Sequence, residues 1–125
     1  SVREKRVPEG VEVYEINGPF FFGVANNLRN ALDQIEKPPK VIILRMRYVP
    51  HIDATGLNAL REFHSRCVKH GTRLLLGGVH AHPLFEMVRV GMDVAIGLEN
   101  IHENLDDALV QARTIVNQKA HLPPA

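Results

Sequence analysis

The segment of this sequence best suited to chemistry is Asp53-Ala54-Thr55-Gly56-Leu57, which lies between an apolar run and a helical pattern. An aspartate at such a junction can accept hydrogen bonds from the free amides of a helix start. Gly56 lets the backbone turn tightly, and Thr55 would present a hydroxyl at the carboxyl end of a sheet, where ligands and partners usually meet an open α/β fold. The spacing alone is explained by capping worth about 1 kcal/mol. A loop that binds a partner or an anion is the functional alternative.

The energy available at a helix start limits what this loop can bind. Free N–H groups and the helix dipole attract anions, but the dipole contributes only about 0.3–1 kcal/mol when it is exposed. Even millimolar affinity needs about 4 kcal/mol, and the carboxylate of Asp53 would repel an anion. We therefore expect no cofactor, with weak nucleotide or anion binding at this loop as the alternative.

Several histidines invite other interpretations. His80 and His82 have a spacing that would allow both imidazoles to bind one metal ion, but no third ligand lies nearby in the sequence, so no metal site is predicted. His51 and His64 would give a pH-sensitive contact if they approached the loop around Asp53. Exposed histidines without a role are the simpler interpretation.

The single cysteine, Cys67, is not predicted to be a nucleophile. It falls on the same helical stripe as Leu57, Leu60 and Phe63, which favours a buried structural thiol. The sequence contains no Gly-x-Gly-x-x-Gly, P-loop or Gly-x-Ser-x-Gly motif. We therefore predict that the chain is not an enzyme.

Size and charge restrict the class of protein further. The chain has 125 residues, enough for one domain, with 15 basic and 14 acidic residues and a net charge of +1. This balance argues against a dedicated nucleic-acid binder. No run approaches the roughly 20 apolar residues that span a bilayer. One cysteine is compatible with a reducing compartment.

The pattern of apolar residues predicts an α/β domain that positions the loop. We expect a linker over residues 1–10, leading from an upstream membrane region, the domain itself over 11–118, and a tail over 119–125. The predicted order is β-β-α-β-α-β-α-β-α, with about five strands and four helices in a mostly parallel sheet. The first two strands would form an antiparallel edge. Strands are predicted at 11–16, 20–22, 41–46, 74–76 and 94–98, and helices near 26–35, 56–71, 83–91 and 104–116.

Two stretches of the sequence resemble a known family. An Asp-x-Thr-Gly-Leu motif directly after a buried strand looks like the signature of STAS domains, a family shared by anion transporters and anti-sigma-factor antagonists. The opening residues 11–23, VEVYEINGPFFFG, are similar to the first strand pair of the transporter branch. The resemblance spans about residues 8–116. It implies a single STAS-type fold.

Three features of the resemblance favour the transporter branch. The antagonists typically have a serine before the glycine, which a partner kinase phosphorylates to switch binding off. This chain has Thr55 there, and Ala54 replaces a hydroxyl often found beside it. The opening segment is transporter-like, and the basic residues near the start suit a domain that follows a membrane segment. The short connection 37–40 is typical of bacterial members.

The resemblance implies the cytoplasmic regulatory and interaction domain of a sulfate-permease (SulP) type secondary transporter of sulfate, bicarbonate or dicarboxylate. Such a domain would lie on the cytoplasmic face of the plasma membrane, here a bacterial inner membrane. Its partners would be the membrane domain of its own polypeptide, a second protomer or a soluble cytoplasmic protein, and no nucleic acid. One alternative is a free-standing anti-sigma-factor antagonist switched by phosphorylation of Thr55. Another is a weak nucleotide-binding module.

Overall fold

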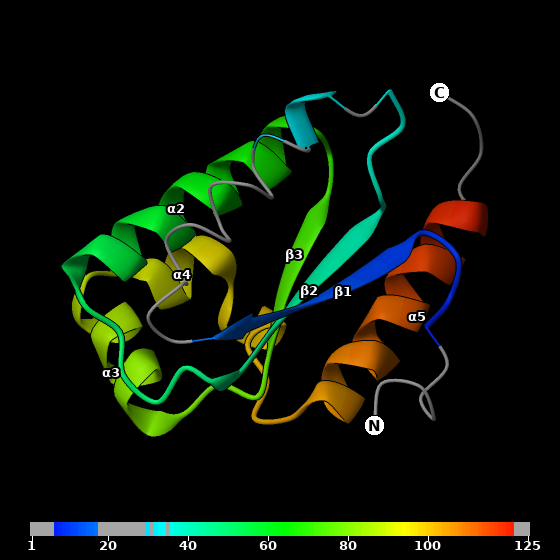
Figure 1. Ribbon diagram of the computed structural model, residues 1–125. Helices are drawn as coiled ribbons and strands as arrows, with labels where there is room; N and C mark the ends of the chain where they lie inside the picture. Colours follow the sequence, from blue (N-terminus) through cyan, green and yellow to red (C-terminus); the bar gives the residue numbers. More distant parts are fainter. Residues whose placement is uncertain (1–6, 18–29, 31, 35, 122–125) are drawn as a thin grey trace.

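A parallel sheet forms the centre of the fold. The computed structural model describes residues 7–17, 30, 32–34 and 36–121. In this part of the chain, three parallel strands lie in the order β1 (Val11–Asn17), β2 (Val41–Tyr48), β3 (Arg73–Gly77). Val41 lies opposite Val11 on one side and Arg73 on the other. The predicted parallel sheet is therefore confirmed for these strands (Figure 1).

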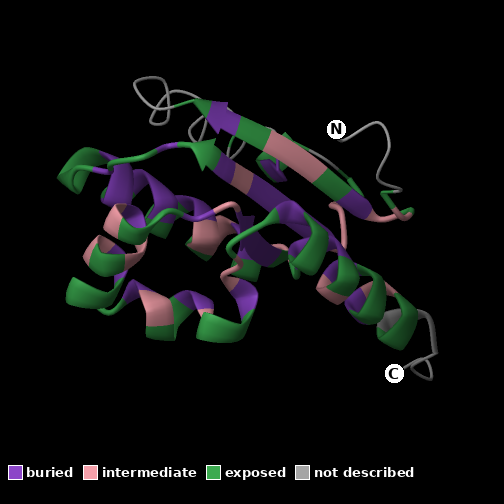
Figure 2. Cartoon of the chain, turned by 90° about the horizontal axis from the view of Figure 1, so that it is seen from below, coloured by how far each residue is buried: buried purple, intermediate pink, exposed green. Residues whose placement is uncertain are grey.

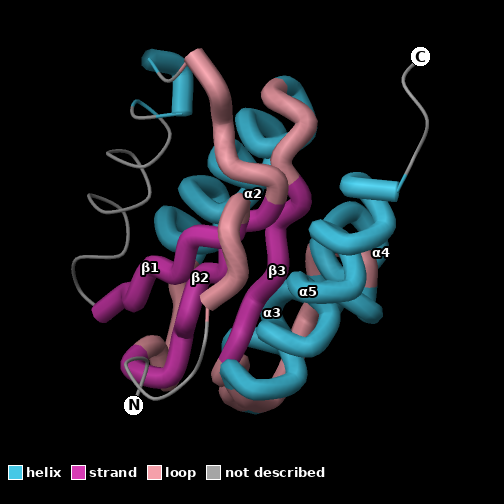
Figure 3. Tube along the Cα trace, turned by 90° about the vertical axis from the view of Figure 1, so that its right-hand side faces the viewer, coloured by secondary structure: helices cyan, strands magenta, loops and turns pink. Residues whose placement is uncertain are grey.

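Helices cover both faces of this sheet. The helices α2 (Ala54–Lys69) and α5 (Leu105–His121) lie on opposite faces, as Figures 1 and 3 show. Two shorter helices, α3 (Ala81–Arg89) and α4 (Met92–Ile96), pack on the same side as α2 and are followed by the 3-10 helix η2 (Leu98–Asn100). No helix among the described residues combines the length and apolar character needed to cross a bilayer.

The sheet separates two hydrophobic cores, because successive strand side chains point to opposite faces. Figure 2 shows buried residues along the strands and on the sides of the helices that face them. Ile42 and Leu44 of β2 face α2, whereas Val41 and Ile43 face α5. The continuous apolar run of β2 thus follows from burial on both faces, as predicted. The larger core contains Ile16, Leu32, Ile42, Leu44, Met46, Val49, Ile52, Leu57, Ala59, Leu60, Phe63, Cys67, Leu74, Leu76, Val79, Met87, Met92 and Ile96. The smaller core contains Val11, Val41, Ile43, Leu75, Leu105, Ala108, Leu109, Ala112 and Ile115.

The strand predicted at 94–98 is wrong. Residues Met92–Ile96 form α4, in which Met92 and Ile96 are buried at a spacing of one helical turn while Val94 is 80% exposed. Glycines with positive φ, Gly91 and Gly97, bound this helix. The only strand-like pairing near this segment in the described part of the chain is a single parallel bridge between Ile101 and Leu76.

Two predicted elements fall largely on residues that the structure does not describe. The strand predicted at 20–22, and with it the antiparallel edge, lies outside the described residues. So does most of the helix predicted near 26–35, although residue 30 and residues 32–34 are helical and Leu32 is buried. The pairing described for β1 is parallel, with β2.

Candidate functional site

The loop between β2 and α2 places the predicted site residues at the carboxyl edge of the sheet. Oδ1 of Asp53 accepts a hydrogen bond from the backbone N–H of Gly56 at 2.8 Å, and the backbone carbonyl of Asp53 accepts from Leu57 at 2.9 Å. The helix therefore begins at Ala54, two residues before the predicted start. The capping role predicted for Asp53 is confirmed.

Burial divides the five residues of this segment into two groups. Asp53, Ala54 and Thr55 are exposed, whereas Gly56 and Leu57 are buried. Leu57 belongs to the larger core. The structure thus brings all five residues together at one helix start, with the first three on the surface and the last two directed into the fold.

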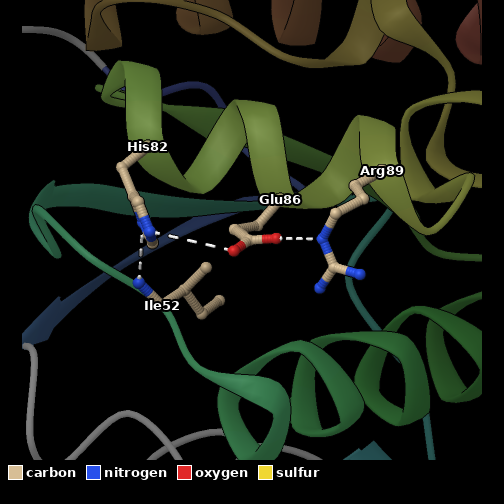
Figure 4. A network of polar contacts seen from close by, with 4 residues as sticks. All are labelled: Ile52, His82, Glu86 and Arg89. Carbon is tan, nitrogen blue, oxygen red and sulfur yellow. Dashed lines mark hydrogen bonds and ion pairs between the residues drawn. The ribbon is translucent and has the colours of Figure 1, made fainter.

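A histidine of α3 holds the loop from the other side (Figure 4). The backbone N–H of Ile52, directly before Asp53, donates to Nδ1 of His82 at 3.3 Å. Nε2 of His82 lies 3.9 Å from Oε1 of Glu86, whose second oxygen accepts a hydrogen bond from Nε of Arg89. Sequence reasoning missed this network, because the contact joins residues 30 positions apart.

The other histidines lie differently from the sequence hypothesis. His51 belongs to the loop itself, two residues before Asp53, and packs its ring edge-on against His82 with the ring centroids 4.8 Å apart. His64 does not approach the loop, because it is eleven residues along α2 from Asp53, about 16 Å at the usual helical rise. Partial burial lowers the pKa of His64 below its ordinary 6.5.

His80 and His82 bind different backbone groups. Nε2 of His80 lies 2.6 Å from the carbonyl oxygen of Arg47, whereas Nδ1 of His82 contacts the amide of Ile52. The two imidazoles therefore act as separate ties between α3 and the end of β2. Among the described residues, no three His, Cys, Asp or Glu side chains are grouped to hold a metal ion.

Two arginines of β2 have partners near their own strand. Nη1 of Arg45 lies 3.6 Å from Oε1 of Glu15 on β1, and the guanidinium of Arg47 lies 4.5 Å from the centre of the Tyr48 ring. Arg45 shares the parity of Ile43 and so lies on the face of the sheet that α5 covers, away from α2. The register of β1 and β2 shifts after Arg45, so this alternation does not extend to Arg47.

Cys67 is a buried structural residue, as its helical position predicts. Its side chain is fully buried in the larger core beside the α2 stripe. Burial raises the pKa of this thiol to about 12. A thiolate, which is the nucleophilic form, is therefore strongly disfavoured.

The fold and the capped loop can now be compared with known proteins. The sequence profile of the STAS domain family matches residues 3–108. The chain belongs to the STAS domain family. The resemblance carried by the Asp-x-Thr-Gly-Leu motif is therefore confirmed.

This STAS domain is similar to proteins of sulfate transport. It is 29% identical over 107 residues to "Putative sulfate transporter YvdB" of Bacillus subtilis (strain 168), covering 85% of this chain and 20% of that protein. The domain thus spans about a fifth of the length of this curated relative.

Solved structures agree with this assignment. A sulfate transporter family protein from Wolinella succinogenes is 52% identical, with a TM-score of 0.86 over 94% of this chain and 96% of that one. The STAS domain of a SulP transporter from Vibrio cholerae is 28% identical, with a TM-score of 0.84 over 94% of this chain and 93% of that one. The murine anion transporter Slc26a9, at 21% identity and a TM-score of 0.70, shares the fold over 87% of this chain and 18% of its own. The relatives named here are described as sulfate or anion transporter proteins or as the STAS domain of such a transporter.

Proposed function

We propose that this STAS domain is the cytoplasmic regulatory and interaction domain of a SulP-type secondary transporter of sulfate, bicarbonate or dicarboxylate, located at a bacterial inner membrane. Its main partner would be the membrane domain of the same polypeptide. The similarity to transporter STAS domains and the small share of the YvdB sequence that it spans support this proposal. A second protomer or a soluble cytoplasmic protein would be an additional partner.

The observation that carries the proposal is the exposed, rigidly capped start of α2. Asp53, Ala54 and Thr55 are exposed while the next two residues are buried, so the exposed start of the helix is joined directly to the core. A partner can approach such a surface closely at little entropic cost, because the helix is already ordered. We assign the contact to Asp53, Ala54 and Thr55, and the support of that contact to Gly56 and Leu57.

The same geometry favours a protein partner over an anion. Oδ1 of Asp53 already accepts the N–H of Gly56, so a negative charge occupies the helix start. An anion would have to bind next to this carboxylate. Weak nucleotide or anion binding is the less supported role for the loop. A titration with ATP that moved only the amides of residues 53–57 would support it.

The interface can be tested in the full-length transporter with two threonine substitutions. Thr55 and Thr114 are both exposed but lie on α2 and α5, on opposite faces of the sheet. Thr55→Arg adds bulk and charge at the proposed contact, and Thr114→Arg adds the same group elsewhere. We expect Thr55→Arg to lower anion uptake several-fold at unchanged protein abundance, and Thr114→Arg to leave uptake unchanged. Equal uptake in the two variants would exclude this loop as the contact.

The exposure of Thr55 also supports the alternative of a phosphorylation switch. A kinase could reach the hydroxyl, and the phosphate would add about −1.5 to −2 charges next to Asp53. The complete gene product distinguishes this alternative. Multiple apolar spans upstream of Arg3 would support the transporter domain, whereas a natural start close to Ser1 and phosphorylated Thr55 in protein from the native host would support the antagonist.

A further inference from the structure

The hydrogen bond between Ile52 and His82 fixes the protonation state of the imidazole. A backbone N–H is only a donor, so Nδ1 of His82 must present its lone pair to Ile52. The ring is then neutral, and its single hydrogen lies on Nε2, which faces the carboxylate of Glu86. This contact is possible only in the neutral form, since both nitrogens of a protonated imidazole are donors.

We propose that His82 is a proton-sensitive latch for the β2–α2 loop. Protonation of Nδ1 removes the acceptor of the Ile52 N–H and directs the ring toward an ion pair with Glu86. The loop that leads into Asp53 then loses its tie to α3. We expect the partner to bind this loop less tightly in acid than at neutral pH. This consequence rests on the proposed function of the loop.

Charged and titratable groups face His82 from its own helix and from the loop. Glu86 lies one turn further along α3, and its second oxygen accepts a hydrogen bond from Nε of Arg89. His51, from the loop, packs edge-on against His82.

Two further groups flank this arrangement. Asp53 follows Ile52 directly and adds a negative charge to the loop, while its side chain holds the N–H of Gly56. His80 lies two residues before His82 and is tied to the carbonyl of Arg47. Histidine is the side chain whose charge ordinarily changes between about pH 5 and 8, so a test of the latch covers this range.

The position of Ile52 explains how the release would reach the signature motif. The side chain of Ile52 is buried in the larger core and its amide is bonded to α3, so it anchors the chain one residue before the helix cap. Without the amide contact, the anchor is the side chain alone. The orientation of Asp53 and of the exposed Thr55 is then less restricted, although the cap itself persists.

Nuclear magnetic resonance of the isotope-labelled 125-residue chain tests the latch between pH 8 and 5. We expect the His82 ring to carry its hydrogen on Nε2 at pH 8. We also expect the amide of Ile52 to move upfield on acidification with the same midpoint as the His82 ring. A hydrogen on Nδ1 at pH 8, or an Ile52 amide that does not follow His82, would overturn the proposal.

Three variants sharpen this test. His82→Gln should abolish the titration of the Ile52 amide. His51→Asn should keep that titration, because the acceptor nitrogen of His82 remains. His70→Gln, at a histidine bonded to Asp33 instead, should change nothing at Ile52, and a lost titration in this control would also contradict the latch. Since no partner is present, failure here leaves the Thr55→Arg uptake test unaffected, and failure of that test leaves the latch unaffected.

Discussion

The backbone N–H of Gly56 lies 2.8 Å from Oδ1 of Asp53, so the first residue of the signature motif satisfies the amide of the fourth. The first role of the motif is therefore structural, as the N-cap of α2. Ala54 and Thr55, which are exposed, lie between the two bonded residues and are held by them.

Removal of the cap should destabilise the domain. We expect Asp53→Ala to lower the free energy of unfolding by about 1 kcal/mol, within the range of roughly 0.5–2 kcal/mol typical of lost N-caps. Asp53→Asn keeps an oxygen acceptor and should cost much less. Urea denaturation of the two variants measures the difference. Equal losses would mean that the charge, and not the hydrogen bond, stabilises the helix start.

The turn after β3 should tolerate no side chain. Gly78 and Gly71 both have a φ of +71°, but a Cβ on Gly78 would lie 3.2 Å from the backbone nitrogen of Arg47, whereas a Cβ on Gly71 would meet nothing within 4 Å. Gly71→Ala should cost about 1 kcal/mol for its left-handed backbone. Gly78→Ala should cost more, because the strand end must also move.

Thermal denaturation of this glycine pair separates the two effects. The loss shared by both variants reports the backbone conformation, and the excess in Gly78→Ala reports the close approach to Arg47. Similar losses for both variants would show that the end of β2 moves away freely.

The thiol of Cys67 should be unreactive in the folded domain. It is fully buried, and its pKa is raised to about 12, so both access and thiolate formation are suppressed. Iodoacetamide at pH 8 should label the chain rapidly in urea and slower by a factor on the order of 10³ or more without it, since labelling then requires opening of the core. Mass spectrometry of the time course measures both rates. Rapid labelling of the native chain would contradict the burial of α2.

His64 should make stability depend on pH. Because burial lowers its pKa in the folded chain, the unfolded chain binds this proton at a higher pH than the folded chain does. The contribution is therefore fully present above the unfolded value of 6.5 and is lost as the pH falls below it towards the folded value. Denaturation midpoints between pH 7.5 and 5 should fall less steeply for His64→Gln than for the parent chain. Identical slopes would assign the pH dependence to other groups.

Much of the fold follows from local patterns. The run Val41–Met46 predicts a strand buried on both faces because it is apolar without interruption and has the length of a strand. The stripe from Leu57 to Cys67 predicts the buried side of α2 because it repeats with the helical period. The segment 94–98 is too short for that test. The apolar residues of this segment fit a strand and a single helical turn equally well. The helix forms because it buries both Met92 and Ile96 in the larger core.

The site is less predictable than the fold. Capping by Asp53 joins residues only three positions apart, so the local sequence is enough to predict it. The contact of His82 with Ile52 depends on α3 returning to the end of β2 after β3, a tertiary relationship that no local spacing encodes. The sequence does place a histidine directly before Pro83 at the start of a helix. That position does not indicate that the histidine binds the amide of Ile52.

The burial of β2 on both faces also constrains which substitutions the strand can accept during evolution. Val41 and Ile43 belong to one core and Ile42 and Leu44 to the other, so neighbouring residues of the strand pack against different helices. A volume change at Ile43 can be compensated by Leu109 on α5, but not by its immediate neighbour Leu44, which packs with the α2 layer. Substitutions at alternate positions of this strand should therefore form two sets. Each set should covary with substitutions in the helix on its own face and be nearly independent of the other set.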